Sequence, residues 1–418
     1  ADRAKASKVK ELQLWGECYG RFLGKYLIDD KKEPKHRSKN SVLVFGSEFV
    51  YLDNGQKEEK QVMLKFMSDN NSFSQEIDMR EIVENSTKSG ANANKYVAMA
   101  RAAFTAEPEL GDLPGVIYRD DFLDHVAEYE HLQLANDHPD HVIVMECGSG
   151  LDLGDIMRHQ RFEGEDELDN VLDIARSIAE ILSYLNDVCA IMHGGVHAGH
   201  FVSTNDGHFM IVDFTSSDVI GKGVMTQRQS STGYLPPEQA AITCFENSPL
   251  RNVSSTDGSS MNSELQQELM ILEKKLEFHK TMMDKAEPQF RPYVQASIEG
   301  IHGQIQAIEN STRQEESIPE ELEASAQYDM WCFGLVLYQL CTKKHLFYVD
   351  GQGNVDLYDL VSIRDFTVRE LDTKLSDNFP DEGELHTFIP LVRELLDPDP
   401  SKRPSSWESV LDMLECTI

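Results

Sequence analysis

The stretch from Ile191 to Asp213, IMHGGVHAGHFVSTNDGHFMIVD, constrains the fold of this chain more than any other. Its first part, residues 193–200, is rich in glycine and histidine and is typical of a turn. Two short apolar runs follow, separated by Asn-Asp-Gly at residues 205–207. Apolar runs joined by such a turn predict a β-hairpin. The hairpin would leave the carboxylate of Asp213 just beyond the end of its second strand.

The order of these features resembles the catalytic core of the protein-kinase fold. In that family a loop of the form H-R-D-L-x-x-x-N precedes a hairpin, and a D-F-G motif follows it. His193 takes the place of the loop histidine, and Asp213-Phe214 takes the place of the first two letters of D-F-G. His200 stands thirteen positions before Asp213, which is the family's spacing. The resemblance implies a bilobal α+β fold in which His193 and Phe214 are structural residues.

The positions that carry the chemistry of phosphoryl transfer differ from the family pattern. Gly195 replaces the catalytic aspartate, His197 replaces the loop lysine, and His200 replaces the metal-binding asparagine. The third letter of D-F-G is Thr215. A glycine has no side chain to orient an acceptor hydroxyl, and Mg²⁺ prefers oxygen ligands to imidazole. We therefore expect no catalytic residue in this loop and only Asp213 as a metal ligand.

A second resemblance lies upstream, in the run QVMLKFM at residues 61–67. It is similar to the third strand of the family, V-A-I-K, whose lysine binds the α- and β-phosphates of ATP and pairs with a helix glutamate. Lys65 matches this lysine. Glu76, in the helix predicted from SFSQEIDMREIV, is the candidate partner. Its spacing is short for the family, so Glu81 is kept as an alternative.

Of the two remaining parts of the family's nucleotide site, the glycine-rich loop is not matched by this sequence, whereas the hinge is. Residues 37–41 occupy the place of the glycine-rich loop but contain no glycine, so they are predicted to form a solvated loop. The strand predicted at residues 141–145 resembles the strand that leads into the family's hinge. The resemblance implies that Met145 borders the back of an adenine pocket and that Glu146 and Cys147 line it.

A further pair of motifs is architectural. The sequence TGYLPPE, which ends at Glu238, resembles the A-P-E ending of the family, and Arg403 in DPDPSKRP fits the position of its buried partner. A helix that begins D-x-W-x-x-G normally follows within about a dozen residues. Here that pattern begins at Asp329, so residues 244–325 are predicted to be an insertion.

The insertion contains two segments with apolar residues at helical spacing, which predict a helical hairpin over residues 261–310. The two stripes either pair with each other or bind a second protein, and we expect a protein partner there. The expected domains are a helical extension at 1–26, an N-terminal lobe at 27–145 with an insertion at about 106–140, a C-terminal lobe at 146–418, and the hairpin insertion at 244–325.

Composition excludes some classes of partner. The net charge is −33, from 72 acidic and 39 basic residues, which argues against binding to nucleic acid or to anionic membranes. The seven cysteines form no C-x-x-C pair, so neither a zinc site nor a disulfide framework is predicted. No apolar run is long enough to span a bilayer, and we expect no signal peptide. We expect a cytoplasmic protein.

Together these features favour a pseudokinase that serves as a protein-interaction scaffold or allosteric regulator. Two alternatives stay open: a weakly active, ATP-dependent protein kinase, and a switch that binds ATP with Mg²⁺ through Lys65, Glu76 and Asp213 without turning it over. A less favoured hypothesis is a transition-metal site at His193, His197 and His200, since imidazole suits Zn²⁺ or Ni²⁺.

Overall fold

The computed structural model of this chain describes most of its residues, and the structural statements below concern these alone. The described residues are 22, 25–28, 34, 36–38, 40–51, 56–86, 93–107, 116–118, 139–148, 151–159, 167–204, 206–224, 232–246, scattered positions between 272 and 305, 322–350, 353–379 and 383–416.

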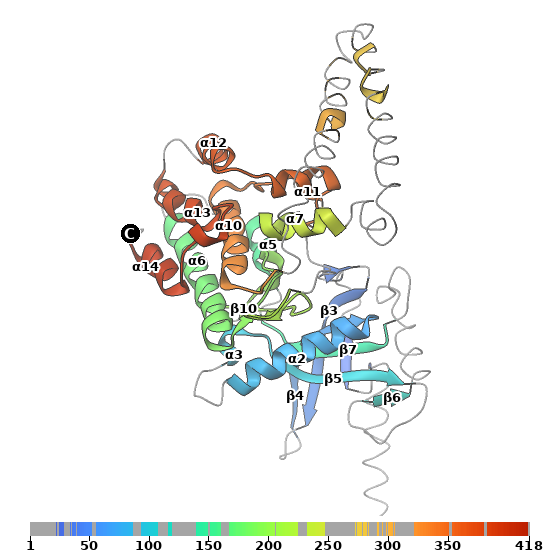
Figure 1. The fold of residues 1–418 in the computed structure, drawn as a ribbon. Coiled ribbons are helices and arrows are strands. Elements are labelled where there is room, and N and C mark those ends of the chain that lie inside the picture. The colour runs from blue at the N-terminus through green and yellow to red at the C-terminus, as the bar shows by residue number, and fades with distance from the viewer. Residues whose placement is uncertain are drawn as a thin grey trace, which may run out of the picture. The chain divides into compact units, whose positions relative to one another are not determined.

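The fold is of the mixed α+β type, as predicted, and the chain divides into two compact units (Figure 1). The first unit is built on a β-sheet and comprises residues 1–166, 176–191 and 198–217. The second unit is mainly helical and comprises residues 167–175, 192–197 and 218–418. The long helix α6 (Glu167–Ser183), which ends in a π-helical turn at Tyr184–Val188, and the short strand β8 (Ile191–Met192) belong partly to each.

The sheet of the first unit has seven strands in the order β1-β3-β4-β7-β5-β6, with β2 paired to β3. All of these pairs are antiparallel except β5 with β6, which is parallel. The strands are β1 (Tyr26–Ile28), β2 (His36–Arg37), β3 (Ser41–Tyr51), β4 (Lys57–Met67), β5 (Ala100–Glu107), β6 (Val116–Tyr118) and β7 (His141–Glu146).

Strand β3 is long and continuous because it pairs along its whole length with β4. Its middle residues, 46–48, also pair with β1. Gly46 allows this double pairing, because a Cβ atom there would lie 2.6 Å from the carbonyl oxygen of Leu27.

Side chains alternate between the two faces of the sheet, as the pleat of a β-strand requires. On β4, Val62, Leu64 and Phe66 point into one apolar cluster, while Met63 and Met67 point into another on the opposite face. We call the second group the inner cluster; its buried members are Leu43, Met63, Met67, Ala98, Ile143, Met145, Val202 and Val212.

The remaining elements of the first unit include the predicted hairpin, which is confirmed. Its strands pair with Phe209 opposite Ser203 and Ile211 opposite Phe201, and Gly207 adopts a positive φ of 86° at the turn. Figure 1 shows α2, in blue, crossing the sheet. The elements are α2 (Asn70–Ser86), α3 (Ala93–Tyr96), α5 (Leu153–His159), a 3₁₀ turn at Ala198–His200, β9 (Phe201–Ser203) and β10 (Phe209–Ile211).

The second unit is organised around α10, which is buried along most of its length. Gly334 lets α10 approach α13 closely, because a Cβ atom there would lie 2.9 Å from side-chain atoms of Leu395 and Leu396. Its elements are β11 (Asp218–Val219), a 3₁₀ turn at Thr232–Tyr234, α7 (Pro237–Glu246), α10 (Ala326–Thr342), α11 (Leu357–Arg364), α12 (Val368–Asn378), a 3₁₀ turn at Glu384–Phe388, α13 (Ile389–Leu395), a 3₁₀ turn at Pro400–Lys402 and α14 (Trp407–Glu415).

Within the predicted insertion, the described positions between 272 and 305 are helical. Leu272 and Leu276 of the first helical segment pack against Ile298 and Ile301 of the second in one buried cluster. The two apolar stripes therefore pair with each other at these positions. The rest of the hairpin lies outside the described residues.

Two domain boundaries need correction. Tyr26, placed at the end of a helical extension, begins β1, because Tyr26 and Ile28 are buried on one face while Leu27 is exposed; residues 1–21 lie outside the described part. The insertion predicted at about 106–140 begins inside β5, and residues 116–118 extend the same sheet as β6.

Candidate functional site

Lys65 and Glu76 form the centre of the candidate site, in the first unit. Strand alternation places Lys65 on the same face of β4 as Met63, and α2 contacts this strand. The Nζ atom of Lys65 lies 2.5 Å from Oε2 of Glu76, and both residues are buried, at 3% and 0% exposed. The predicted pair is thus confirmed, while the alternative partner, Glu81, is exposed.

Two further charged side chains complete what we call the buried ion cluster: Lys65, Glu76, Arg80 and Asp213. Lys65 Nζ lies 2.9 Å from Oδ2 of Asp213, and Arg80 Nη1 lies 2.8 Å from Oε1 of Glu76. Two cations thus face two carboxylates, and their formal charges cancel. A cluster of this kind satisfies the requirement that buried charges be paired.

Arg80 also connects the ion cluster to two residues singled out from the sequence. Its guanidinium lies over the ring of Phe214, with 4.9 Å between the central carbon and the ring centroid. Its Nη2 donates a hydrogen bond of 2.8 Å to the Sδ atom of Met145. Phe214 and Met145 therefore help to position a buried cation, a role that their motifs did not predict.

Asp213 is held by its neighbours on both carboxylate oxygens. Its Oδ1 accepts hydrogen bonds from the hydroxyl of Thr215 at 2.6 Å and from the backbone N–H of Thr215 at 3.2 Å. Its Oδ2 accepts from Lys65, and Nε2 of His200 lies 3.8 Å from the same atom. Asp213 also has a positive φ of 69°, a conformation that disfavours most side chains.

Their mutual attraction keeps Lys65 and Asp213 ionised although burial opposes ionisation. Burial alone would raise the pKa of Asp213, but attraction to Lys65 and His200 and the hydrogen bond from Thr215 hold this pKa well below its usual range. Burial would likewise lower the pKa of Lys65, yet the carboxylates of Asp213 and Glu76 raise it above the usual lysine value. Both residues are therefore charged at neutral pH.

Apolar side chains fill the face of the sheet on which Lys65 lies. Met63, Met145, Val202 and Val212 of the inner cluster are at most 2% exposed, and Leu43 is 7% exposed. The cluster joins strands β3, β4 and β7 to the hairpin β9–β10. The predicted pocket residue Met145 is thus part of a packed core.

The other two predicted hinge residues lie elsewhere in the first unit. Glu146 and Cys147 line an open hollow of about 670 Å³ together with Gln61, Arg101 and other polar residues. Arg101 Nη1 lies 4.0 Å from Oε1 of Glu146. Lys65 and Asp213 are not among the residues that line this hollow.

The segment that replaces the glycine-rich loop forms the turn between β2 and β3, and Arg37 in it is exposed, in keeping with the expected solvated loop. β2 pairs with β3, with Arg37 opposite Val42. The hydroxyl of Ser38 accepts hydrogen bonds from the N–H groups of Asn40 and Ser41, at 3.3 and 3.0 Å. Amides that would be free to bind phosphate in an open loop already have partners here.

Residues 193–197 of the altered loop belong to the second unit, where Asp329 fixes their backbone. The N–H groups of His193 and Gly194 donate to the two carboxylate oxygens of Asp329 at 2.7 and 2.9 Å. His193 is fully buried, and its Nδ1 atom accepts a hydrogen bond of 3.3 Å from the N–H of Gly195. His193 and Asp329 therefore both fix the backbone of this segment.

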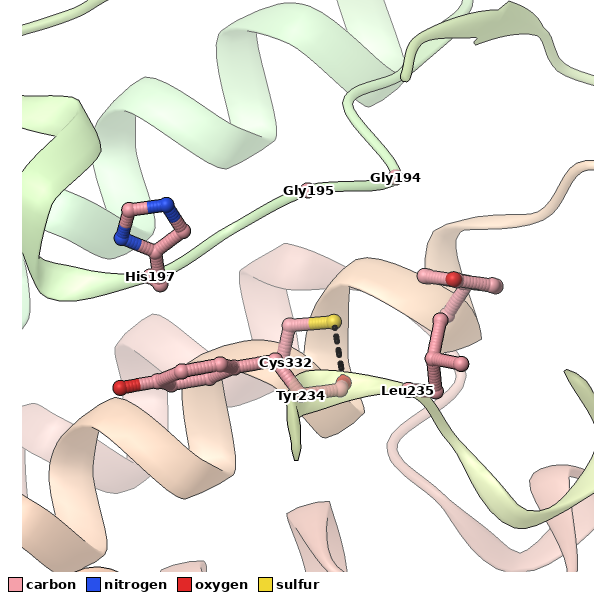
Figure 2. A pocket seen from close by; sticks show the side chains of 7 residues that line it. Gly194, Gly195, His197, Tyr234, Leu235 and Cys332 are labelled. Atoms are coloured by element: carbon pink, nitrogen blue, oxygen red, sulfur yellow. Dashed lines mark hydrogen bonds between the residues drawn. The ribbon is translucent and has the colours of Figure 1, made fainter. Parts of the chain in front are cut away.

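Gly195 and His197 border a narrow space in the same unit (Figure 2). The ring of His197 lies 5.6 Å from that of Tyr234, and the thiol of Cys332 donates to the carbonyl oxygen of Tyr234 at 3.2 Å. The space is too narrow for a water molecule. Burial raises the pKa of Tyr234 to about 12, so its hydroxyl is neutral at physiological pH.

Glu238 and Arg403 form the predicted architectural pair. The two guanidinium nitrogens donate to the two carboxylate oxygens at 2.7 and 2.8 Å, which is the bidentate geometry of strong arginine–carboxylate pairs. Arg403 also donates to the backbone carbonyl of Gln327 and lies over the ring of Trp331, 5.0 Å from its centroid.

Some residues of the site were missed from the sequence. Arg80 lies four positions after Glu76, the spacing at which helix side chains meet, so this pattern could have revealed it. Thr215 was noted only as a departure from D-F-G. Met63 stands where the motif V-A-I-K has an alanine, and its larger side chain could have indicated the apolar packing seen around it.

Comparison with other proteins does not assign the site. No family model matches the chain, and no curated protein matches it. In the described part of the chain, no group of three or more His, Cys, Asp or Glu residues is arranged to hold a metal ion. None of the described helices has the length and apolar character needed to cross a membrane.

Proposed function

We propose that this chain is a protein-kinase-like domain that does not transfer phosphate, and that it acts as an interaction scaffold or allosteric regulator. The observation that carries the proposal is the packed environment of Lys65. An adenine ring in the implied pocket would lie between the strands and the hairpin β9–β10, beside Met145. Met63, Val202 and Val212 already pack together there, each at most 2% exposed. ATP would have to displace a packed core.

The ion cluster supports the same conclusion for the metal. A Mg²⁺ ion would need oxygen ligands from Asp213, but both of its carboxylate oxygens already accept hydrogen bonds or an ion pair within the first unit. Binding of Mg²⁺ would have to compete with Lys65 and Thr215. ATP with Mg²⁺ is therefore a poor fit to the arrangement described here.

The altered loop supports a lack of turnover. Gly195 offers no group to orient an acceptor hydroxyl. His197 offers no permanent charge to stabilise a transferred phosphate, whereas lysine would, because imidazole is only partly protonated near neutral pH. These substitutions remove the groups on which phosphoryl transfer depends, whereas the buried charges that stabilise the fold are retained.

The scaffold part of the proposal concerns the insertion. A protein partner at residues 261–310 is still a prediction. Because Leu272, Leu276, Ile298 and Ile301 pack against one another, such a partner would contact other faces of the hairpin. A soluble, strongly acidic chain favours a partner with a basic surface.

The decisive experiment is a thermal-shift titration with ATP, with and without Mg²⁺ or Mn²⁺. A ligand that binds only the native state stabilises it by mass action and so raises Tm. At a ligand concentration of 100 Kd, the free energy of unfolding rises by about 2.7 kcal/mol. We expect no shift at millimolar ATP for the natural sequence. The variant Met63→Ala, which restores the small residue of V-A-I-K, should gain an ATP-dependent shift if Met63 is what fills the pocket.

A Mg²⁺-dependent shift of the natural sequence would contradict the proposal. If no phosphate is then transferred, the result favours an ATP-binding switch. If phosphate is transferred, and the transfer disappears in Asp213→Asn, the result favours a weakly active kinase.

A further inference from the structure

Strand β4 has an unpaired edge beside the hollow that Glu146 and Cys147 line, in the first unit. β7 pairs with β4 only along residues 62–67, and Glu146 opposite Val62 is the last pair. Residues 57–61 of β4 continue beyond this point and pair with β3 alone among the described strands. We call residues 57–61 the open edge. Three of them, 59–61, line the hollow, whose volume of about 670 Å³ is within the usual range of ligand sites.

The path of the chain after β7 explains why the edge is open. Gly148 passes so close to β9 that a Cβ atom there would lie 2.0 Å from the carbonyl oxygen of Ser203. The chain therefore turns towards the hairpin β9–β10 instead of continuing along β4, and glycine permits this close approach. A strand that continued β7 would stand opposite the open edge, so the hollow lies where β4 lacks its next neighbour.

The hydrogen bonds of β4 show which backbone groups face the open edge. In an antiparallel ladder the N–H and C=O groups of one residue point to the same side, and successive residues alternate between the two sides. The N–H of Ser68 donates to the carbonyl oxygen of Asn40 at 2.9 Å, in register with the β3–β4 ladder. Even-numbered residues of β4 therefore bond to β3. The residues that direct their N–H and C=O groups to the open edge are Lys57, Glu59 and Gln61.

The cationic side chains that line the hollow already have carboxylate partners. Arg101 stands at a shift of register in β5, and its Nη2 atom lies 2.8 Å from Oε2 of the buried Glu48. A bulge of this kind redirects a side chain out of the regular ladder. Nζ of Lys60 lies 3.4 Å from Oε2 of Glu58. The two positive charges are therefore largely neutralised within the first unit.

Two acidic side chains of the hollow have no such partner. Neither Glu59 nor Asp206 pairs with a lysine or arginine among the described residues. The hydroxyl of Thr204 donates a hydrogen bond to Asp206 and lowers the pKa of this carboxyl, so it is charged at neutral pH. Glu146 has only the distant Arg101, 4.0 Å away. The hollow therefore has a surplus of negative charge, which favours a cationic occupant.

We propose that the open edge binds an extended segment of another protein that carries arginine or lysine side chains. The segment adds to the sheet as a strand beside β4. Its backbone bonds to the N–H and C=O groups of Lys57, Glu59 and Gln61, and its basic side chains pair with Glu59 and Asp206. Open edge and hollow thus supply affinity and selectivity, respectively.

A second copy of this chain fits the open edge less well. Antiparallel pairing of two open edges about Glu59 would set two carboxylates opposite each other, and like charges in that position are destabilising. The open edge is also separate in sequence from the hairpin at 261–310. The inference therefore depends neither on a partner of that hairpin nor on whether the chain binds nucleotide.

Peptide binding to the full chain tests the charge requirement. The probe is the acetylated and amidated peptide Val-Arg-Val-Arg-Val, and its control has citrulline, a neutral isostere, in place of arginine. We expect the arginine peptide to bind at least about fivefold more tightly, and Glu59→Gln with Asp206→Asn to remove this preference. Asp78→Asn with Glu81→Gln, at exposed positions of α2, changes the net charge equally and should retain it. Equal binding of the two peptides, or binding of neither, would overturn the proposal.

Hydrogen exchange resolved to single residues tests the added strand. At saturation, the arginine peptide should slow the amides of Lys57, Glu59 and Gln61 about tenfold or more, because these N–H groups gain acceptors. The amides of residues 58 and 60, which already bond to β3, should not change. The same peptide N-methylated at every residue keeps its charge but cannot approach as a strand, so it should give no protection.

Two results of this exchange experiment would overturn the proposal. Equal slowing of all five amides, or protection by the N-methylated peptide, would show that the peptide binds through its charge alone. Protection that needs no peptide and grows with protein concentration would identify a second copy of the chain as the occupant.

Discussion

Two buried ion-pair sites in the described part of this chain neutralise their charges in different ways. In the first unit, four side chains share their charges, and Glu76 has a cation on each of its oxygens. In the second unit, Arg403 meets one carboxylate, that of Glu238, and completes its hydrogen bonds with backbone carbonyls. Glu76 is fully buried, whereas the side chain of Glu238 is 15% exposed.

The contacts within these ion-pair sites give the charged motif residues a structural role. Such residues can therefore be present in a chain that has no catalytic activity. On the proposed relation to protein kinases, Lys65, Glu76 and Asp213 would be read as signs of ATP binding. Each of them also neutralises a buried neighbour, and removing one leaves an uncompensated charge. Gly195 carries no such constraint. The residues that match the motifs are those whose loss would destabilise the fold, so their presence alone is no argument for catalysis.

The largest loss in the free energy of unfolding is expected from Glu76→Leu. This change leaves Lys65 and Arg80 buried with a single carboxylate between them, so we expect a loss of about 3–5 kcal/mol in the free energy of unfolding. Chemical denaturation monitored by circular dichroism would measure it. Glu81→Gln, on the exposed side of the same helix, is the matched control and should stay within about 0.5 kcal/mol.

A second variant checks the reason for that loss. In Glu76→Leu with Arg80→Met, only Lys65 and Asp213 remain, and their charges cancel. The double variant should therefore be less destabilised than the sum of the two single variants. A strictly additive result would show that the four residues do not act as one cluster.

A smaller loss, of about 3 kcal/mol, is expected from Arg403→Met in the second unit. The released carboxylate of Glu238 is partly exposed and can regain some hydration, which places the effect at the lower end of the range for broken buried pairs. Arg393→Met is the matched control, since Arg393 and Asp372 form an exposed pair worth at most about 1 kcal/mol. If the two arginine variants lose equal stability, the buried pair is no stronger than a surface one.

Local patterns of the sequence predicted a large part of these sites. The hairpin β9–β10 followed from two apolar runs and a glycine turn, and the pairs Lys65–Glu76 and Glu238–Arg403 followed from the order of motifs. Element boundaries were less accurate. Tyr26 and Ala106 join the sheet through partners far away in the sequence, which no local period reveals.

The contacts that distinguish this site are non-local and could not be predicted in the same way. Nothing in the spacing of Met63, Val202 and Val212 shows that they pack into one cluster, because the fold brings together β4, β9 and the residue that follows β10. The pairing of Ala324 with Lys222 is another example, since about a hundred residues separate them. The apolar stripes of the insertion showed that each needed a partner, but the fold decides that they pair with each other.

The smallest change in the free energy of unfolding is expected when pH is varied within the neutral range. The pKa of Asp213 is depressed in the folded protein, so its ionisation contributes stability that is complete above the unfolded value of about 3.9 and is lost as pH falls through the lower folded value. The pKa of Lys65 is raised, so its contribution is complete below about 10.4 and is lost as pH rises through the folded value.

These two groups should therefore give no slope in the free energy of unfolding between about pH 5 and 9. Asp213→Asn should be less stable than the natural sequence by a constant amount between about pH 7.5 and 9, where imidazoles are neutral, and the difference should shrink once pH falls below about 4. Urea denaturation at a series of pH values would measure it, with Glu81→Gln as the control. A difference that grows as pH falls would mean that Asp213 is protonated in the folded protein, and that the ion cluster of the first unit is not the neutralised core inferred here.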